Sequence, residues 1–167
     1  MKKLFLLFLM AGFAAGAYAQ ATASAAASAT IVTPIAITKT VDMNFGNVAT
    51  DGTAGTVVLD PAGSRTQTGG VTLPATAGTV AAASFDVTGE GAYTYSITLP
   101  TSLTISDGAA TPNTMTVDAF TSNPSGTGAL TAGAQTLTVG ATLNVGASQV
   151  SAAYTNATGF DVTVNYN

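Results

Sequence analysis

Apolar and polar residues alternate over most of this chain, and Gly, Pro and Asn separate the alternating segments. A period of two is typical of a β-strand with one buried face, because successive side chains point to opposite faces of a sheet. The longest such segments cover residues 93–99, 136–145 and 160–167. No segment after residue 19 keeps the 3.6-residue apolar spacing of a helix. The pattern predicts an all-β protein with essentially no helix in its mature part.

Shorter segments complete the predicted set of nine to eleven strands. We expect them near residues 29–38, 41–45, 56–59, 71–73, 84–88, 103–106 and 115–117. The Gly69-Gly70 pair predicts a turn before the strand at residue 71. Short strands at this spacing favour one two-sheet, immunoglobulin-like (pilin-like) sandwich over residues 29–167, with a closed barrel as the alternative.

The first expected strand carries two local signals. Pro34 has no N–H to donate to a sheet, which places this strand at an edge or makes it change partner midway. Lys39 falls on the apolar face, which indicates a break between Thr38 and Val41. The apolar residues of this strand that share one face are Ile31, Ile35 and Ile37.

The N-terminus has the pattern of a secretion signal. Lys2 and Lys3 precede an apolar run, and Ala17-Tyr18-Ala19 fits a small-x-small cleavage site. We expect residues 1–19 to be a signal peptide and residues 20–28 a flexible leader rich in Ala, Ser and Thr. The mature protein is then secreted, reaching the extracellular space or cell surface through the periplasm. No later segment is apolar enough for membrane insertion.

The chemistry of the chain is sparse. It has no His and no Cys, and twelve of its 167 residues are charged. Without His, a serine nucleophile lacks the usual base, so we expect no enzyme, no catalytic residue and no cofactor. Removal of residues 1–19 leaves two basic and eight acidic side chains, a net charge of −6. Such a field repels nucleic acid and anionic lipid, so no nucleic-acid partner is expected.

The few polar candidates have structural interpretations beside functional ones. Asp before Gly or Pro, as at Asp51, Asp60 and Asp107, is typical of turns in which the carboxylate accepts bonds from the following backbone. The lone arginine, Arg65, is expected to pair with an Asp or to bond carbonyls at a strand end, with an anionic partner as the alternative.

Two further sets of residues leave a ligand open. Asp86 and Glu90 lie close enough in sequence to share a calcium ion, but no Asp-x-Asp spacing supports such a site, and we predict no metal. Tyr93 and Tyr95 share a strand face that fits either a sugar-stacking platform or the core. The alternation with Ile97 and Leu99 favours the core.

Several strings resemble a known family when taken together. They are residues 35–40, 43–48, 65–71, 95–100, 139–143 and 162–167. This set resembles the secreted bacterial domain of unknown function numbered 4402, and it covers nearly the whole mature chain. Phe45-Gly46 and the penultimate Tyr166 are also similar, more distantly, to features of spore-coat-protein-U-like and chaperone–usher pilin subunits. The chain departs from the pilins in lacking a cysteine pair.

The pilin resemblance implies self-association by β-strand addition, in which the N-terminal strand of one copy completes the sandwich of another. Ile31, Ile35 and Ile37 would be the donor positions. Phe160, Val162, Val164 and Tyr166 would line the accepting groove or an adjacent strand. The expected function is a non-enzymatic subunit of a fimbria-like or coat-like structure that forms a homopolymer. The alternative is a monomeric secreted binding module, with a glycan as a conceivable but unsupported ligand.

Overall fold

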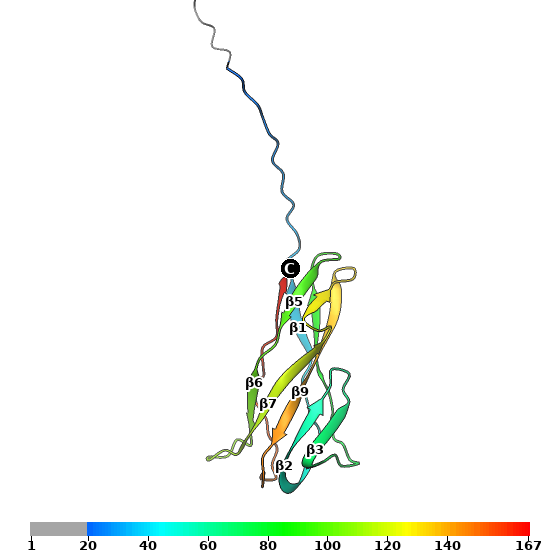
Figure 1. Ribbon diagram of the computed structural model, residues 1–167, viewed down its shortest axis with the longest axis vertical. Coiled ribbons are helices and arrows are strands. Elements are labelled where there is room, and N and C mark those ends of the chain that lie inside the picture. Colours follow the sequence, from blue (N-terminus) through cyan, green and yellow to red (C-terminus); the bar gives the residue numbers. More distant parts are fainter. Residues whose placement is uncertain (1–19) are drawn as a thin grey trace, which may run out of the picture. The chain divides into compact units, whose positions relative to one another are not determined.

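The computed structural model describes residues 20–167, which form ten β-strands and no helix (Figure 1). The strands are β1 (Ala36–Val41), β2 (Ala49–Leu59), β3 (Arg65–Thr72), β4 (Ala83–Thr88), β5 (Thr94–Thr98), β6 (Ser102–Ser106), β7 (Thr114–Asn123), β8 (Thr127–Ala129), β9 (Ala134–Val145) and β10 (Thr163–Tyr166). The all-β prediction is confirmed, and the number of strands lies within the predicted range.

The strands form two antiparallel sheets in a sandwich-like arrangement. The larger sheet has seven strands. Five of them follow the order β1-β4-β9-β2-β3; β7 also pairs with β9, and β6 pairs with β7. The smaller sheet has the order β10-β5-β8. Both sheets are open, with β1 and β3 at edges of the larger one, so the closed-barrel alternative is wrong. The edge position that Pro34 predicted for the first strand is confirmed.

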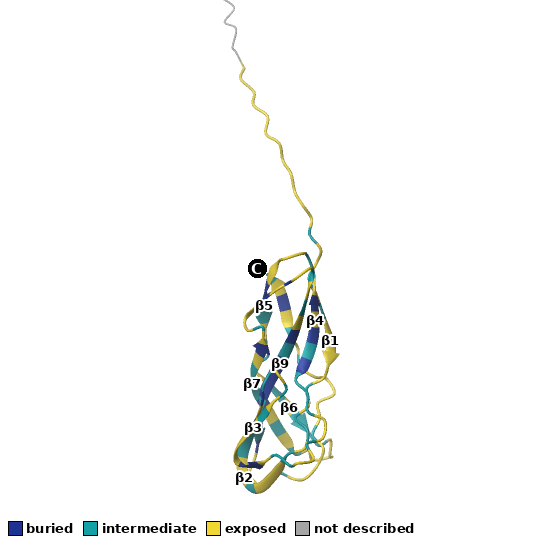
Figure 2. Ribbon diagram, turned by 90° about the vertical axis from the view of Figure 1, so that its right-hand side faces the viewer, coloured by how far each residue is buried: buried dark blue, intermediate teal, exposed yellow. Residues whose placement is uncertain are grey.

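Strand β9 is the centre of the larger sheet. Its first half pairs with β4, its second half pairs with β2, and β7 lies along its other edge. The predicted alternation is visible in its burial: Leu137, Val139, Leu143 and Val145 are buried, whereas Thr138, Thr142 and Asn144 between them are half-buried. Figure 2 shows β9 mostly in the colours of buried and intermediate residues. All twelve of its residues pair with β4, β2 or β7, in a sheet whose inner face is apolar and whose outer face is polar.

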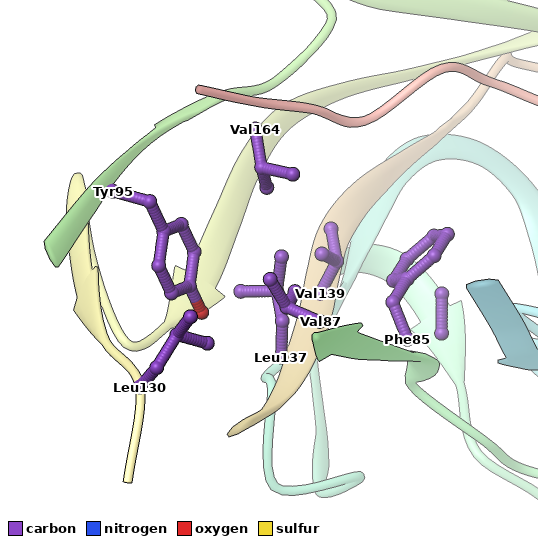
Figure 3. Packing of buried hydrophobic residues seen from close by; sticks show 8 residues of the cluster. Phe85, Val87, Tyr95, Leu130, Leu137, Val139 and Val164 are labelled. Carbon is purple, nitrogen blue, oxygen red and sulfur yellow. The ribbon is translucent and has the colours of Figure 1, made fainter. Parts of the chain in front are cut away.

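Two clusters of buried residues form the core. The first core cluster lies where the two sheets face each other, and Tyr95 and Val164 of the smaller sheet pack there against Val87, Leu137 and Val139 of the larger one (Figure 3). Burial raises the pKa of Tyr95, whose hydroxyl donates to Oε1 of Gln135 at 2.7 Å. The prediction that Tyr95 belongs to the core is confirmed. The same prediction is wrong for Tyr93, which precedes β5, is 45% exposed and lies against the ring of Tyr166.

The second core cluster lies toward the other end of β9. Its buried residues are Val57, Val71, Val117, Ala141, Leu143 and Val145. No strand of the smaller sheet contributes to this cluster. It is instead covered by partly buried side chains of irregular chain, among them Met43, Phe45 and Val48. The two halves of the sandwich are thus closed in different ways.

The first strand starts later than the sequence predicted. It was expected from Ala29, but β1 begins at Ala36, two residues after Pro34. Pro34 has no N–H to donate to a ladder. Just before it, the backbone N–H and carbonyl of Thr33 are bonded by the side chains of Glu90 and Tyr166 instead of by a strand. The irregularity signalled by Lys39 is confirmed, since the β1–β4 register shifts between Lys39 and Val41.

The expectation of a turn at Gly69-Gly70 is wrong, because both glycines lie inside β3. A Cβ atom on Gly69 would meet the carbonyl oxygen of Ala54, and the β2–β3 register shifts between Thr50 and Gly55. The glycines therefore allow two strand backbones to approach at a bulge rather than ending a strand. The partner β2 runs for 11 residues, where the sequence predicted only residues 56–59.

Adjacent valines of β2 give a matched test of this packing. Val57 is fully buried and Val58 is 39% exposed on the outer face. Val57→Ala is expected to lower the free energy of unfolding by about 1.5–3 kcal/mol, through lost burial and a cavity. Val58→Ala shares the loss of β-propensity but should cost less than about 1 kcal/mol. Urea denaturation of both variants measures the difference, and equal losses would contradict the assigned faces.

Candidate functional site

An open cavity of about 1020 Å³ lies beside the second core cluster in the described part of the chain. One wall is the inner face of β6, β7 and β9. The other wall is formed by residues 42–50, which are irregular chain leading into the start of β2, and by the irregular residues 149–160. The apolar side chains that line it are Met43, Phe45, Val48, Leu103, Ile105, Met115, Val117, Leu143, Val145, Val150 and Phe160. Asp42 is the only charged side chain among the lining residues.

Arg65 supports one side of this cavity. Its Nη1 donates to the carbonyl oxygen of Phe45 and, at 2.9 Å, to that of Asn47. The Asn47 side chain in turn donates to the carbonyl oxygen of Thr76 at 3.0 Å. These bonds satisfy backbone groups that no sheet partner reaches, and they fix the 42–50 segment against the larger sheet. The predicted structural role of Arg65 is confirmed, although the carbonyls it bonds lie in irregular chain between β1 and β2 and not at a strand end.

The covering segment, residues 146–160, forms the other side. It follows β9 and contains no strand, and most of its residues are exposed. One backbone bridge joins Thr155 to Ser106 of β6, with N–H···O distances of 2.8 and 2.9 Å. Asn156 Nδ2 donates to the carbonyl oxygen of Thr104 at 2.7 Å. Between these contacts and β9, three small residues of the segment, Ser151, Ala152 and Ala153, line the cavity beside the larger Gln149, Val150 and Tyr154.

Tyr154 holds the covering segment together internally. Its hydroxyl donates to the carbonyl oxygen of Val150 at 2.7 Å and accepts from Nε2 of Gln149 at 2.8 Å. From Gly146 to Gly159 the segment thus rests on a few polar contacts, and its last residue, Phe160, packs against the first core cluster. Segments with few buried apolar contacts are those that open at low free-energy cost.

Asp51, Asp60 and Asp107 accept bonds from the following backbone as the sequence predicted, although Asp51 does so within the irregular part of β2. Asp51 accepts from the backbone and hydroxyl of Thr53, and Asp60 accepts from the N–H groups of Ala62 and Ser64. The Asn113 side-chain amide, followed by backbone N–H groups, lowers the pKa of Asp107. Among residues 20–167 no three His, Cys, Asp or Glu side chains come together to hold a metal ion.

A second polar cluster fixes the start of the domain. The carboxylate of Glu90 accepts from the N–H of Thr33 at 3.0 Å, and this bond lowers the pKa of Glu90. The hydroxyl of Tyr166 donates to the carbonyl oxygen of Thr33 at 2.8 Å and accepts from the N–H of Glu90 at 2.6 Å. We call Thr33, Glu90 and Tyr166 the Thr33 clamp. It ties the chain just before β1 to the last strand.

The Thr33 clamp and the cavity lie at opposite ends of β9. Thr88, the last residue of β4, pairs with both Ala36 at the start of β1 and Ala134 at the start of β9. The cavity is lined instead by Val145, the last residue of β9. Eleven residue steps of about 3.3 Å separate the two ends, which is about 36 Å along the strand.

The predicted donor residues fall into two groups. Ile31 is 97% exposed. Ile35 and Ile37 are partly buried in their own chain, where they pack against the first core cluster. The donation of these residues to a neighbouring copy stays a prediction.

The predicted acceptor residues lie mostly in that same cluster. Val164 is one of its buried members, and Phe160, Val162 and Tyr166 pack against it together with Ile35 and Ile37. Of these four only Phe160 also borders the cavity. The residues that line the cavity, such as Leu103, Ile105 and Met115, were assigned to strands by the sequence but not to a site.

One signal in the sequence indicates the cavity's outer wall. Residues 146–159 form a long stretch between two clearly alternating segments that has no alternation of its own. A polar, non-alternating stretch of this length predicts that a covering strand is missing there. In the sequence, the site is therefore indicated by a stretch without alternation and not by a motif.

A family model described as "Domain of unknown function (DUF4402)" matches residues 35–166. The chain belongs to this family. Comparison with curated proteins and with solved structures gave no match. The resemblance of the DUF4402 chain to spore-coat-protein-U-like and pilin subunits stays a prediction, and so does its export. The predicted signal peptide, residues 1–19, lies outside the described residues. Residues 20–167 include no helix that could span a membrane.

Removal of the Tyr166 hydroxyl tests the Thr33 clamp. Tyr166→Phe keeps the ring but leaves the Thr33 carbonyl and the Glu90 N–H without this partner. We expect a loss of about 1–3 kcal/mol in unfolding free energy and faster amide exchange at Glu90. Tyr93→Phe is the control, because the Tyr93 hydroxyl makes no hydrogen bond within residues 20–167. If both variants behave alike, the clamp has no stabilising role.

The charge of Glu90 makes the clamp sensitive to acid. Its pKa in the folded protein is lowered from the ordinary 4.5, so the bond to Thr33 stabilises above that value and is lost as pH falls through the folded-state pKa. We expect protection of the Thr33 amide, measured by hydrogen exchange, to fall over this acidic range. Glu90→Gln retains an acceptor oxygen that does not titrate, so its protection should stay constant. Parallel loss in both proteins would contradict the assignment.

Proposed function

We propose that this DUF4402 protein is a non-enzymatic structural subunit, exported to the cell surface or beyond, that forms a homopolymer through its N-terminal segment. We define that segment as residues 20–32. The observation that carries the proposal is the combination of an exposed, uncharged N-terminal segment with a domain that begins at a firmly held residue, Thr33.

The N-terminal segment has the pattern of a strand without a partner. Its odd positions from 21 to 29 are all alanine, followed by Ile31, and its even positions are mostly hydroxyl residues. No residue from 20 to 32 belongs to a strand of its own chain. An extended segment of this kind can add to the edge of a sheet, where main-chain hydrogen bonds supply affinity and alternate side chains supply register.

The composition of the segment suits this role. Alanine loses almost no side-chain entropy when it is ordered, and Ser and Thr lose little compared with Lys, Glu or Arg. Burial of Ile31 contributes about 1.5–3 kcal/mol, and the alanine methyl groups about 0.8 kcal/mol each. The attachment surface on the next copy differs from the segment itself, so the association is heterologous and generates an open chain.

The polymer can be tested with the mature chain, residues 20–167. We expect filaments in negative-stain electron microscopy and a concentration-dependent mass in light scattering. Deletion of residues 20–32 should give monomers with an unchanged urea midpoint, because the core residues all lie after Thr33. Ile31→Asp should weaken association at least tenfold by placing a carboxylate in a buried position.

Gln20→Asp is the matched control, since it adds the same charge at the far end of the segment without removing Ile31. It is expected to assemble nearly as well as the wild type. Monomers of the wild-type protein at every concentration would overturn the proposal and favour the monomeric binding module, with the exposed Tyr93 as its first candidate contact.

A further inference from the structure

The outer edge of β6 has only a partial partner. On one side β6 pairs with β7 over all five residues. On the other side the contacts are the Ser106–Thr155 bridge and the Asn156–Thr104 bond, both from the covering segment. Leu103 and Ile105, which alternate with these polar positions, line the cavity. An edge strand with an apolar inner face and a short, irregular partner is a natural template for an added strand.

We propose that the cavity is the acceptor site for the N-terminal segment of a second copy, which adds along β6 after the covering segment has moved aside. This inference rests on the proposed function and identifies its binding surface and its closed state. In the single chain the covering segment occupies the outer edge of β6, through the Ser106–Thr155 bridge and the Asn156–Thr104 bond. Ser151, Ala152 and Ala153 are the smallest of its residues that line the cavity.

The two surfaces suit each other in charge and shape. The N-terminal segment has no charged residue, and Asp42 is the only charged side chain lining the cavity. Met115 of β7 and Met43 of the irregular chain after β1 both line the cavity, and their flexible side chains adapt to an incoming group. Ile31 is the largest side chain on the apolar face of the segment and is already exposed in the single chain.

Chain length favours a second copy over the same copy as the occupant. Thirteen residues, 20–32, span at most about 43 Å when extended. A segment that starts at Thr33 must cover about eight residue steps of β9, or about 26 Å, to reach β6 of its own copy, because Ser102 lies level with Asp118 and Thr142. About five residues then remain to add along β6. A segment from a neighbouring copy can enter with most of its length, so the subunits join end to end.

A disulfide between the covering segment and β6 tests the proposal in the full mature chain. Ser106 and Thr155 exchange two backbone hydrogen bonds, a geometry with a Cα–Cα distance of about 5.5 Å, which a disulfide can bridge. The chain has no cysteine of its own, so Ser106→Cys with Thr155→Cys forms one defined bond. The oxidised variant should fail to elongate, with assembly at least tenfold slower than in the reduced form of the same protein.

The oxidised variant, which we call the locked protein, still has a free N-terminal segment. It can therefore test the donor role separately from the acceptor role. Added in small amounts to wild-type protein, it should end growing chains and shorten the filaments, and Ile31→Asp in the locked protein should abolish this effect. A second variant loosens the site without a disulfide: Tyr154→Phe removes the two hydrogen bonds inside the covering segment and should speed assembly several-fold.

The outcomes distinguish this inference from the proposed function. If wild-type and oxidised proteins assemble at the same rate, the covering segment does not close the acceptor site, and the inference fails while the proposed function stands. If the wild-type protein stays monomeric, both fail. If the oxidised protein neither elongates nor caps while its reduced form assembles, the lock has disturbed the donor end, and the proposed separation of the two sites is wrong.

Discussion

The pairing of β9 is the constraint on which the rest of the fold depends. One strand of 12 residues shares its backbone hydrogen bonds with β4, β2 and β7, so its position sets the register of most of the larger sheet. Its inward residues also supply both core clusters, Leu137 and Val139 to the first, Leu143 and Val145 to the second. A shift of one residue would turn all four to the outer face, which makes the register strongly determined.

The two ends of β9 differ in what covers them. At one end the smaller sheet packs on the core and satisfies its own backbone groups through strand pairing. At the other end irregular chain takes the place of a second sheet, and its backbone groups depend on side chains such as Arg65, Asn47 and Asn156. Side-chain bonds of this kind hold a segment in place without filling the space beneath it. The open cavity is a direct result.

In this chain with few charges, several of the acidic side chains bond backbone groups and fix the local chain. The carboxylates of Asp51, Asp60 and Asp107 are bonded to the backbone of their own turns, and the lone Glu90 fixes Thr33. Such a chain has few charged side chains with which to recognise a partner through ion pairs. Association through backbone hydrogen bonds and small apolar side chains is what this composition favours, and the proposed strand addition uses both.

The sequence by itself determined the all-β class, the alternation that sorts β9 and β10 into inner and outer residues, the turns at Asp, and the edge position of the strand after Pro34. These follow from local rules: side-chain alternation, proline's missing N–H and short-range bonding by Asp. Tertiary structure decided that Gly69 and Gly70 lie within a strand, because only the approach of Ala54 gives them that role. It also decided that Ile35 and Ile37 pack with Phe160 and Val164, and that the cavity lies beside Leu103 and Met115 instead. Alternation tells which face of a strand is buried, but the partner of that face is set by contacts between residues far apart in the chain.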